Sequence, residues 1–290
     1  MIASLARPAW LRVLTAVYVG VFLVFLFLPL VTVAVFAFND ASYPAPPWRG
    51  FTLDWFLADG SGERTGLFHD TELLGSIWTS VVVSAWVTLL ALGVGTASAF
   101  LMERYRFRGK QLLAALMLAP LVIPGVILGI SILSLSSRIA EFAQASLGVD
   151  LDFLRPGLPL VVLGQLSYMA TITTLIVSAR LKRFDRTLEE AALNLGASQA
   201  AVLRTITFPY LLPALLGAAA VSFLMSFEDF NTTLMLVGAD APLTIMMYGR
   251  MREGASPVLN AVSLFLMLAS AALALALMRG GARRSTGSNN

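Results

Sequence analysis

Two adjacent carboxylates, Glu228 and Asp229, stand inside a long apolar stretch of the sequence. A carboxylate at the centre of a lipid-facing helix costs about 2.5–3.5 kcal/mol on the insertion scale, so an adjacent pair needs a reason. In a path of low dielectric constant, such groups attract a cation far more strongly than they do in water. We therefore predict that the pair lines a path for a cationic solute, and the alternative is that it locks neighbouring helices together.

Hydroxyl and amide side chains accompany this pair at helical spacing. If one helix continues through the stretch, Asp229 shares a stripe with the hydroxyl residues while Glu228 is turned by about 100°, so Asp229 is the better candidate for the path. The candidate path residues are Ser222, Ser226, Glu228, Asp229, Asn231 and Thr233, with Tyr168 from an earlier segment. That earlier segment carries a second stripe, Ser167, Thr171, Thr174 and Ser178, beside Gln165. For hydroxyl stripes of this kind, hydrogen bonding between helices is the favoured interpretation.

A helix needs roughly 20 residues to cross a bilayer, and the acidic pair lies in one of six apolar segments long enough to do so. The segments are Val13 to Phe38, Leu73 to Met102, Gln111 to Leu135, Leu158 to Ala179, Tyr210 to Val237 and Val258 to Met278. The first is too long for the apolar core of a signal peptide, so we expect it to be a retained helix.

Composition supports a membrane location. The chain of 290 residues is 58% hydrophobic and 13% charged, with a mean hydropathy of +0.80. Soluble globular chains are about 45–50% apolar and about 25% charged, so this chain cannot bury its apolar side chains in one soluble core. It has no cysteine and one histidine, which leaves no disulfide framework and no Cys/His metal site to expect.

The distribution of Lys and Arg predicts the topology, because positively charged loops stay in the cytoplasm. With the N-terminus inside, the cytoplasmic segments hold most of the 20 Lys and Arg residues, and both termini are cytoplasmic. These residues are Arg7, Arg12, Arg104, Arg106, Arg108, Lys110, Arg180, Lys182, Arg183, Arg186, Arg204, Arg279, Arg283 and Arg284. The loop between the fourth and fifth segments is then also cytoplasmic.

That loop contains EEAALNLGASQAAVLRTITFP, which has the pattern of two short helices joined by a turn. Gly196 is suited to the left-handed conformation that ends a helix, and Ser198 is suited to cap the next one. Pro209 is expected at the junction with the fifth segment. Arg204 is the one basic residue of the second helix, too little charge for binding nucleic acid. An ordinary helical loop is the alternative that the physics leaves open.

The spacing in this loop resembles the EAA-x3-G-x9-I-x-L-P pattern in the membrane subunits of ATP-binding-cassette importers of the type I, EAA-loop family. The matching residues are Glu190, Ala191, Ala192, Gly196, Ile206 and Pro209, with Phe208 where leucine is usual. The resemblance implies that the loop docks into a groove of an ATPase subunit. Glu190 would make the polar contact there, while Ala191 and Ala192 would permit close approach.

Other segments are similar to the spermidine/putrescine branch of that family, specifically its second permease subunit. They are ERYRFRGK, SARLKRFDRTLEEAALNLGAS and SPVLNA. Permeases for ferric iron, thiamine and phosphonates share much of this pattern, and so would one for an amino-acid-like cation.

The resemblance implies an all-α membrane domain over residues 1–290, with six transmembrane helices, a coupling loop near 181–209 and a short disordered cytoplasmic tail near 280–290. The partners implied are membrane lipid, a homologous permease, favoured to be a different chain, two ATPase subunits that bind ATP and Mg²⁺, and a periplasmic or extracellular binding protein. The expected location is the bacterial inner membrane.

The sequence contains no G-x-x-x-x-G-K-[ST] segment, so we expect ATP hydrolysis on another subunit and no cofactor in this chain. Gly93 and Gly95 in the second segment are interpreted as sites of close helix packing. The third segment carries Gly125 and Gly129 beside Pro120 and Pro124, which predicts a kinked, closely packed helix. A membrane enzyme and a purely structural scaffold remain as rival classes.

Overall fold

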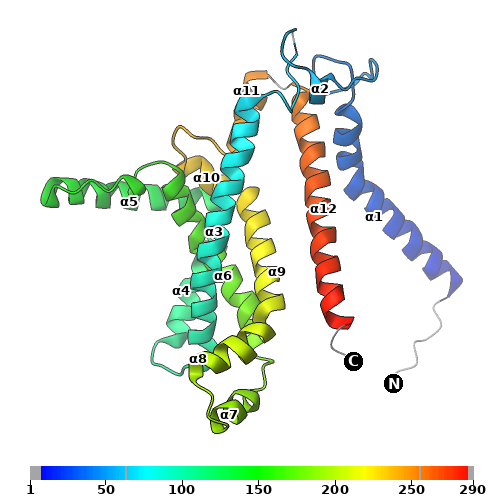
Figure 1. Ribbon diagram of the computed structural model, residues 1–290. Helices are drawn as coiled ribbons and strands as arrows, with labels where there is room; N and C mark the ends of the chain where they lie inside the picture. Colours follow the sequence, from blue (N-terminus) through cyan, green and yellow to red (C-terminus); the bar gives the residue numbers. More distant parts are fainter. Residues whose placement is uncertain (1–7, 63, 255, 287–290) are drawn as a thin grey trace. The chain divides into compact units, whose positions relative to one another are not determined.

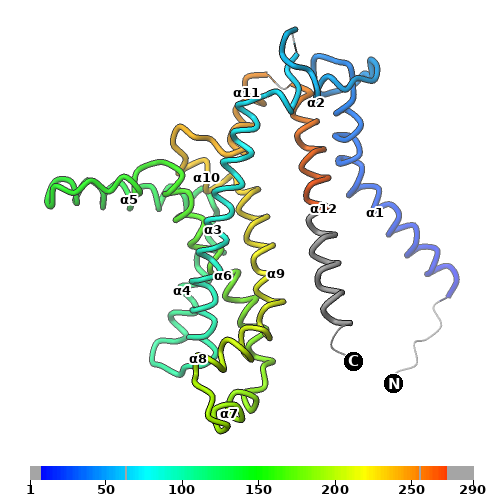
Figure 2. Tube along the Cα trace, viewed as in Figure 1, coloured from blue at the N-terminus to red at the C-terminus, as the bar shows by residue number. Residues whose placement is uncertain are grey.

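The computed structural model describes residues 8–62, 64–254 and 256–286, and side chains as far as residue 272. The chain forms two compact units, Met1–Leu74 with Gly249–Asn290 and Gly75–Tyr248. The described residues are helices joined by loops, with two isolated bridges and no sheet (Figure 1; Figure 2). The all-α prediction is therefore confirmed.

Five helical runs among the described residues are long and apolar enough to cross a membrane. They are α1 (Ala9–Phe36), α3 (Thr71–Arg104), α5 (Gly125–Leu147), α6 (Leu158–Leu181) and the run Gln199–Phe227. Two apolar helices are shorter, α4 (Lys110–Val122) and residues 258–272 of α12 (Val258–Thr286). The first, second and fourth predicted segments correspond to α1, α3 and α6.

The third predicted segment, Gln111 to Leu135, is not one helix. It is divided between α4 and α5, because Ile123 takes an extended conformation before Pro124. Proline disfavours the helical conformation in the residue before it, which explains the break. The kink predicted for this segment is thus confirmed at Pro124, whereas Pro120 stays inside α4. Figure 1 shows α5 extending to the left, away from α4 and α6.

The fifth predicted segment, Tyr210 to Val237, is also wrong as a continuous helix. α9 (Phe208–Phe227) ends before the acidic pair, and a short helix, α10 (Asn231–Leu236), begins after three intervening residues. Asp side chains compete for backbone N–H groups and so favour helix ends over helix interiors. The single stripe expected from Ser222 to Thr233 therefore does not exist.

Within the unit 75–248, α6 is the central helix, in contact with α4, α9 and α10. Its buried apolar side chains pack with residues of α3 and α10. The main cluster consists of Val83, Val87, Ala91, Leu160, Val161, Met169 and Leu236. A second cluster joins α3, α6 and α9 through Ala99, Val177, Leu181 and Leu211.

Glycines allow α5 and α10 to pack closely. A Cβ atom added to Gly125 would lie 3.0 Å from the Cβ of Asn231, and one added to Gly129 would lie 2.8 Å from the Cβ of Met235. Neither distance leaves room for a side chain. The predicted close packing at both glycines is confirmed.

The two glycines of α3 differ in their surroundings. A Cβ atom on Gly95 would lie 2.6 Å from the Cβ of Thr173 and 2.8 Å from the carbonyl oxygen of Ala170, so α3 and α6 approach closely there. A Cβ atom on Gly93 would meet nothing within 4 Å. The packing role predicted for both is therefore confirmed for Gly95, and it is wrong for Gly93 in this chain because its side of α3 faces open space.

In the other unit, the segment between α1 and α3 folds around α2 (Asp54–Leu57). Trp55 is buried, and its indole N–H donates to the carbonyl of Asn39 at 2.8 Å. Arg64 lies over the Trp55 ring and pairs with Asp40. α1 contacts α12, and Phe68 meets Phe265 edge to face with ring centroids 6.0 Å apart.

The C-terminal end differs from the disordered tail expected near 280–290. α12 is helical as far as Thr286, and residues 287–290 lie outside the described part of the chain.

We expect Gly95→Ala and Gly93→Ala to change stability in opposite directions. Alanine favours a helix over glycine by about 1 kcal/mol, so Gly93→Ala should raise or preserve the melting temperature. At Gly95 the added methyl group collides with the α6 backbone, and overpacking of this kind costs about 1–3 kcal/mol. Thermal unfolding in detergent measures both variants. Equal shifts would contradict the packing assigned to Gly95.

Candidate coupling loop and polar path

The predicted turn between two helices is present in the loop 181–209. α7 (Thr187–Asn194) ends at Gly196, whose φ is +88°, in the left-handed region. The Gly196 N–H donates to the carbonyl of Leu193 at 2.9 Å, and the Ala197 N–H donates to that of Ala192 at 3.1 Å. These bonds satisfy carbonyl groups at the end of α7. The left-handed conformation predicted for Gly196 is confirmed.

The second helix begins as predicted and then continues further. Ser198 caps α8 (Gln199–Val202), accepting a hydrogen bond from the Ala201 N–H at 3.2 Å. A π-helical turn, η2 (Leu203–Thr207), then leads directly into α9. Pro209 lies in the first turn of α9 and has no N–H for the carbonyl of Thr205, so a wider turn forms just before it. The junction predicted at Pro209 is thus a π turn within one helical run.

The surface of α7 is open on the side that carries the predicted docking residues. Glu190 and Ala191 are exposed, and Ala192 is half-buried. Leu195, at the tip before Gly196, is 89% exposed. An apolar tip beside an exposed carboxylate is a surface that another protein could cover.

Glu189, which the sequence analysis did not single out, makes the contacts that hold α7. Its carboxylate receives two hydrogen bonds from the guanidinium of Arg104 at the end of α3, one of them at 2.8 Å, and a third from the Thr207 hydroxyl. Burial raises the pKa of Glu189, but the hydrogen bonds from Arg104 and Thr207 outweigh this effect, so its pKa is below the ordinary value. The sequence shows two adjacent glutamates and gives no sign of which one is engaged.

The hydroxyl residues of the predicted path connect helices. The Ser222 hydroxyl lies 3.2 Å from that of Thr173 on α6. The Ser226 hydroxyl donates to the amide oxygen of Gln165, whose amide nitrogen donates to the Thr233 hydroxyl at 2.9 Å. Ser222, Ser226 and Thr233 are all buried. Their contacts are those expected of helix packing.

The fourth-segment stripe behaves in the same way. Thr171 donates to the carbonyl of Met117 on α4 at 2.6 Å, and Thr174 donates to the carbonyls of Gly95 and Ala170. The favoured interpretation of this stripe as hydrogen bonding is confirmed for these two residues. Tyr168 of the same helix is half-buried.

The two carboxylates of the acidic pair have different environments. Asp229 is half-buried and accepts hydrogen bonds from the Thr233 N–H at 2.9 Å and from the Thr233 hydroxyl at 2.7 Å, so it caps the first turn of α10. Glu228 and Asn231 are exposed at the break between α9 and α10. Within the described residues, the Glu228 carboxylate makes no hydrogen bond or ion pair. The break thus presents Glu228 outward while Asp229 holds the backbone.

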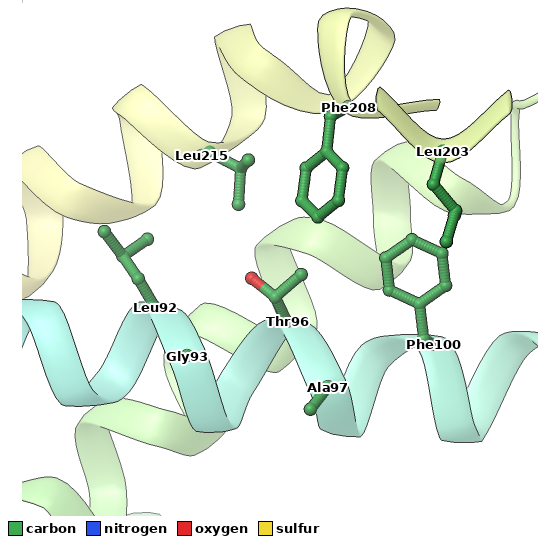
Figure 3. A pocket seen from close by; sticks show the side chains of 8 residues that line it. All are labelled: Leu92, Gly93, Thr96, Ala97, Phe100, Leu203, Phe208 and Leu215. Atoms are coloured by element: carbon green, nitrogen blue, oxygen red, sulfur yellow. The ribbon is translucent and has the colours of Figure 1, made fainter. Parts of the chain in front are cut away.

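An apolar pocket of about 530 Å³ lies between α3 and the start of α9 (Figure 3). Its α3 wall consists of Leu92, Gly93, Thr96, Ala97 and Phe100, and its other wall consists of Leu203, Phe208 and Leu215. The rings of Phe100 and Phe208 have centroids 6.5 Å apart.

The sequence over residues 89–281, which contains both the loop and the candidate path residues, matches a protein family described as "Binding-protein-dependent transport system inner membrane component". This match covers more than half of the chain. The chain belongs to this family. It is therefore a permease of an inner-membrane importer, as predicted.

Two curated relatives are similar to the permease over most of their length. "Putrescine transport system permease protein PotI" of Escherichia coli (strain K12) is 28% identical, over 84% of this chain and 82% of its own. "Spermidine/putrescine transport system permease protein PotC" of the same strain is 27% identical, over 95% of this chain and 94% of its own.

A solved structure shares the fold of the permease. It is described as "Crystal structure of a bacterial ABC transporter involved in the import of the acidic polysaccharide alginate". The TM-score is 0.72 and the identity is 16%, with 94% of this chain and 95% of the other covered.

We expect Asp229→Ala to lower the melting temperature of the purified permease in detergent. The substitution leaves the Thr233 N–H without its acceptor at the start of α10, and loss of such a cap costs about 1 kcal/mol. Glu228→Ala is the matched control, because the Glu228 carboxylate is exposed and makes no described contact. If the two variants melt alike, Asp229 does not have the capping role assigned to it.

Proposed function

We propose that this permease is one of two different membrane subunits of an ATP-driven importer for polyamines such as spermidine and putrescine. The observation that carries the substrate class is the similarity to PotC over 95% of the chain and to PotI over 84%. An exposed carboxylate at the break between α9 and α10 suits a cationic solute of this kind.

The proposed topology has six crossings with both termini in the cytoplasm. The crossings are α1, α3, α4 together with α5, α6, α9 and α12. The concentration of Lys and Arg in the segments that this topology places inside supports it. The third crossing is then a broken one, and irregular backbone at membrane depth is tolerated where protein covers it.

In this proposal the loop from α7 to α8 docks on an ATPase subunit. Glu190 makes the polar contact, and Ala191 and Ala192 permit close approach. The exposure of Glu190 and Leu195 supports this role. Two ATPase subunits bind ATP and Mg²⁺, and a periplasmic or extracellular binding protein delivers the solute to the path between the two permeases.

The acidic pair has divided roles in the proposed path. α9 has 20 residues and is therefore about 30 Å long, so Glu228 lies near the outer boundary of the hydrocarbon core if Phe208 lies near the inner one. There Glu228 attracts the cation on entry, with Asn231 beside it. Asp229 keeps α10 in place, and Ser222, Ser226 and Thr233 hold α9 and α10 against α6.

We expect Gly196→Val to reduce transport while the protein still inserts into the membrane. A side chain in the left-handed conformation costs about 1–2 kcal/mol, so the turn and the docking surface shift. Gly196→Asn is the matched control, since asparagine tolerates this conformation. Uptake and ATP hydrolysis are measured with the assembled complex in vesicles. Full uptake and hydrolysis by Gly196→Val would show that the loop does not couple the two.

We expect Glu228→Gln to lower spermidine uptake by an assembled complex about tenfold, a change of about 1.4 kcal/mol that the loss of one attractive charge readily supplies. Asp229→Asn should lower uptake through a smaller amount of stable complex. Normal uptake by Glu228→Gln would remove Glu228 from the path. Uptake of a neutral or anionic solute in place of spermidine would remove the polyamine assignment.

A further inference from the structure

The Glu189 carboxylate joins three elements at one point. Arg104 ends α3, Glu189 lies in the first turn of α7, and Thr207 ends η2 just before α9. Arg104 donates to both carboxylate oxygens, and the Thr207 hydroxyl donates to one of them. Paired hydrogen bonds from a guanidinium to a carboxylate fix orientation as well as distance. The loop is thus attached by an oriented contact to two of the long helices.

The surroundings keep this contact largely out of solvent. The side chains of Arg104 and Glu189 are 18% and 15% exposed. The Arg104 guanidinium lies over the rings of Phe100 and Phe184, at 5.8 and 5.5 Å from their centroids. An ion pair shielded in this way is weakened little by salt, and removing one partner leaves the other charge partly buried.

A second contact attaches the start of the loop to α3. The Arg186 guanidinium donates to the carbonyl of Glu103 at 2.7 Å, and Lys182 lies 3.6 Å from the Glu103 carboxylate. Both contacts are more exposed than the Arg104–Glu189 pair. They place the chain leading into α7, but they do not reach η2.

The apolar pocket of Figure 3 lies next to this contact, between the same elements. Phe100, Phe208 and Leu203 line a space of about 530 Å³ between α3 and the start of α9. The Glu189 carboxylate connects the elements on either side by hydrogen bonds, because it binds α3 through Arg104 and η2 through Thr207.

We propose that Arg104, Glu189 and Thr207 form a strut that transmits displacement of α7 to α3 and α9 together. This inference rests on the proposed docking of an ATPase subunit on the loop. Glu189 belongs to the strut and faces the transmembrane helices, whereas its neighbour Glu190 faces the ATPase subunit. The adjacent glutamates therefore have different partners. Arg104 and Glu189 are positioning residues, and they contact neither the solute nor ATP.

The test uses the complete complex in vesicles and measures spermidine uptake per ATP hydrolysed. Arg104→Gln and Glu189→Gln should each lower this ratio by about tenfold, an effect within the usual coupling energy of contacting residues. ATP hydrolysis stimulated by the binding protein should persist, since Glu190 and the docking surface are unchanged. Thr207→Val removes one hydrogen bond without a charge, so it should lower the ratio less.

Two further variants separate a strut from a simple charge effect. Arg106→Gln removes an exposed positive charge two residues away and should leave the ratio unchanged. The exchanged pair, Arg104→Glu with Glu189→Arg, should recover part of the ratio lost by either single exchange. A role in stability alone predicts less assembled complex with an unchanged ratio, and that result overturns the proposal.

The outcomes also distinguish this proposal from the proposed function. If the unaltered complex shows no ATP-dependent spermidine uptake, the proposed function fails. If that complex transports and the ratio is unaffected by Arg104→Gln and Glu189→Gln, the strut fails while the function stands. If both variants prevent assembly, Thr207→Val decides, and an unchanged ratio in that variant overturns the strut.

Discussion

A polar group in hydrocarbon has no water to bind, so any interruption of a helix there needs partners from the protein itself. At the break between α9 and α10, the Gln165 side chain links the hydroxyl of Ser226 on α9 to that of Thr233 on α10. The Asp229 carboxylate accepts a hydrogen bond from the Thr233 N–H. These bonds hold the two ends of the break and satisfy the Thr233 N–H, and the position of the exposed Glu228 carboxylate at the proposed path depends on them.

Close packing is the second condition for this arrangement. α10 lies against α5 because Gly125 and Gly129 have no side chains where Asn231 and Met235 approach. α3 approaches α6 at Gly95 for the same reason. Without a hydrophobic driving force between helices in lipid, such small residues allow the contacts and hydrogen bonds that hold the bundle. The break, the short helix and the polar network therefore form one packed unit.

The loop 181–209 was predictable where its structure is local. The left-handed Gly196 and the cap at Ser198 depend on residues a few positions away, so their types and spacing were sufficient. The engagement of Glu189 depends on Arg104, 85 positions earlier, and on Thr207, 18 positions later. No local pattern distinguishes Glu189 from Glu190, and only the fold brings those partners to one of them.

By itself, the sequence determined the membrane location, the all-helical class and the turn of the loop, because composition, apolar length and turn chemistry are properties of short segments. Local chemistry marks Pro124 and Asp229 as places where the apolar runs can break. Tertiary structure decided how the ends of the broken fifth segment are held and that Glu189, not Glu190, is engaged. Gln165 of α6 holds the ends of the break near Glu228, and Arg104 of α3 engages Glu189, and both are contacts between residues distant in the sequence.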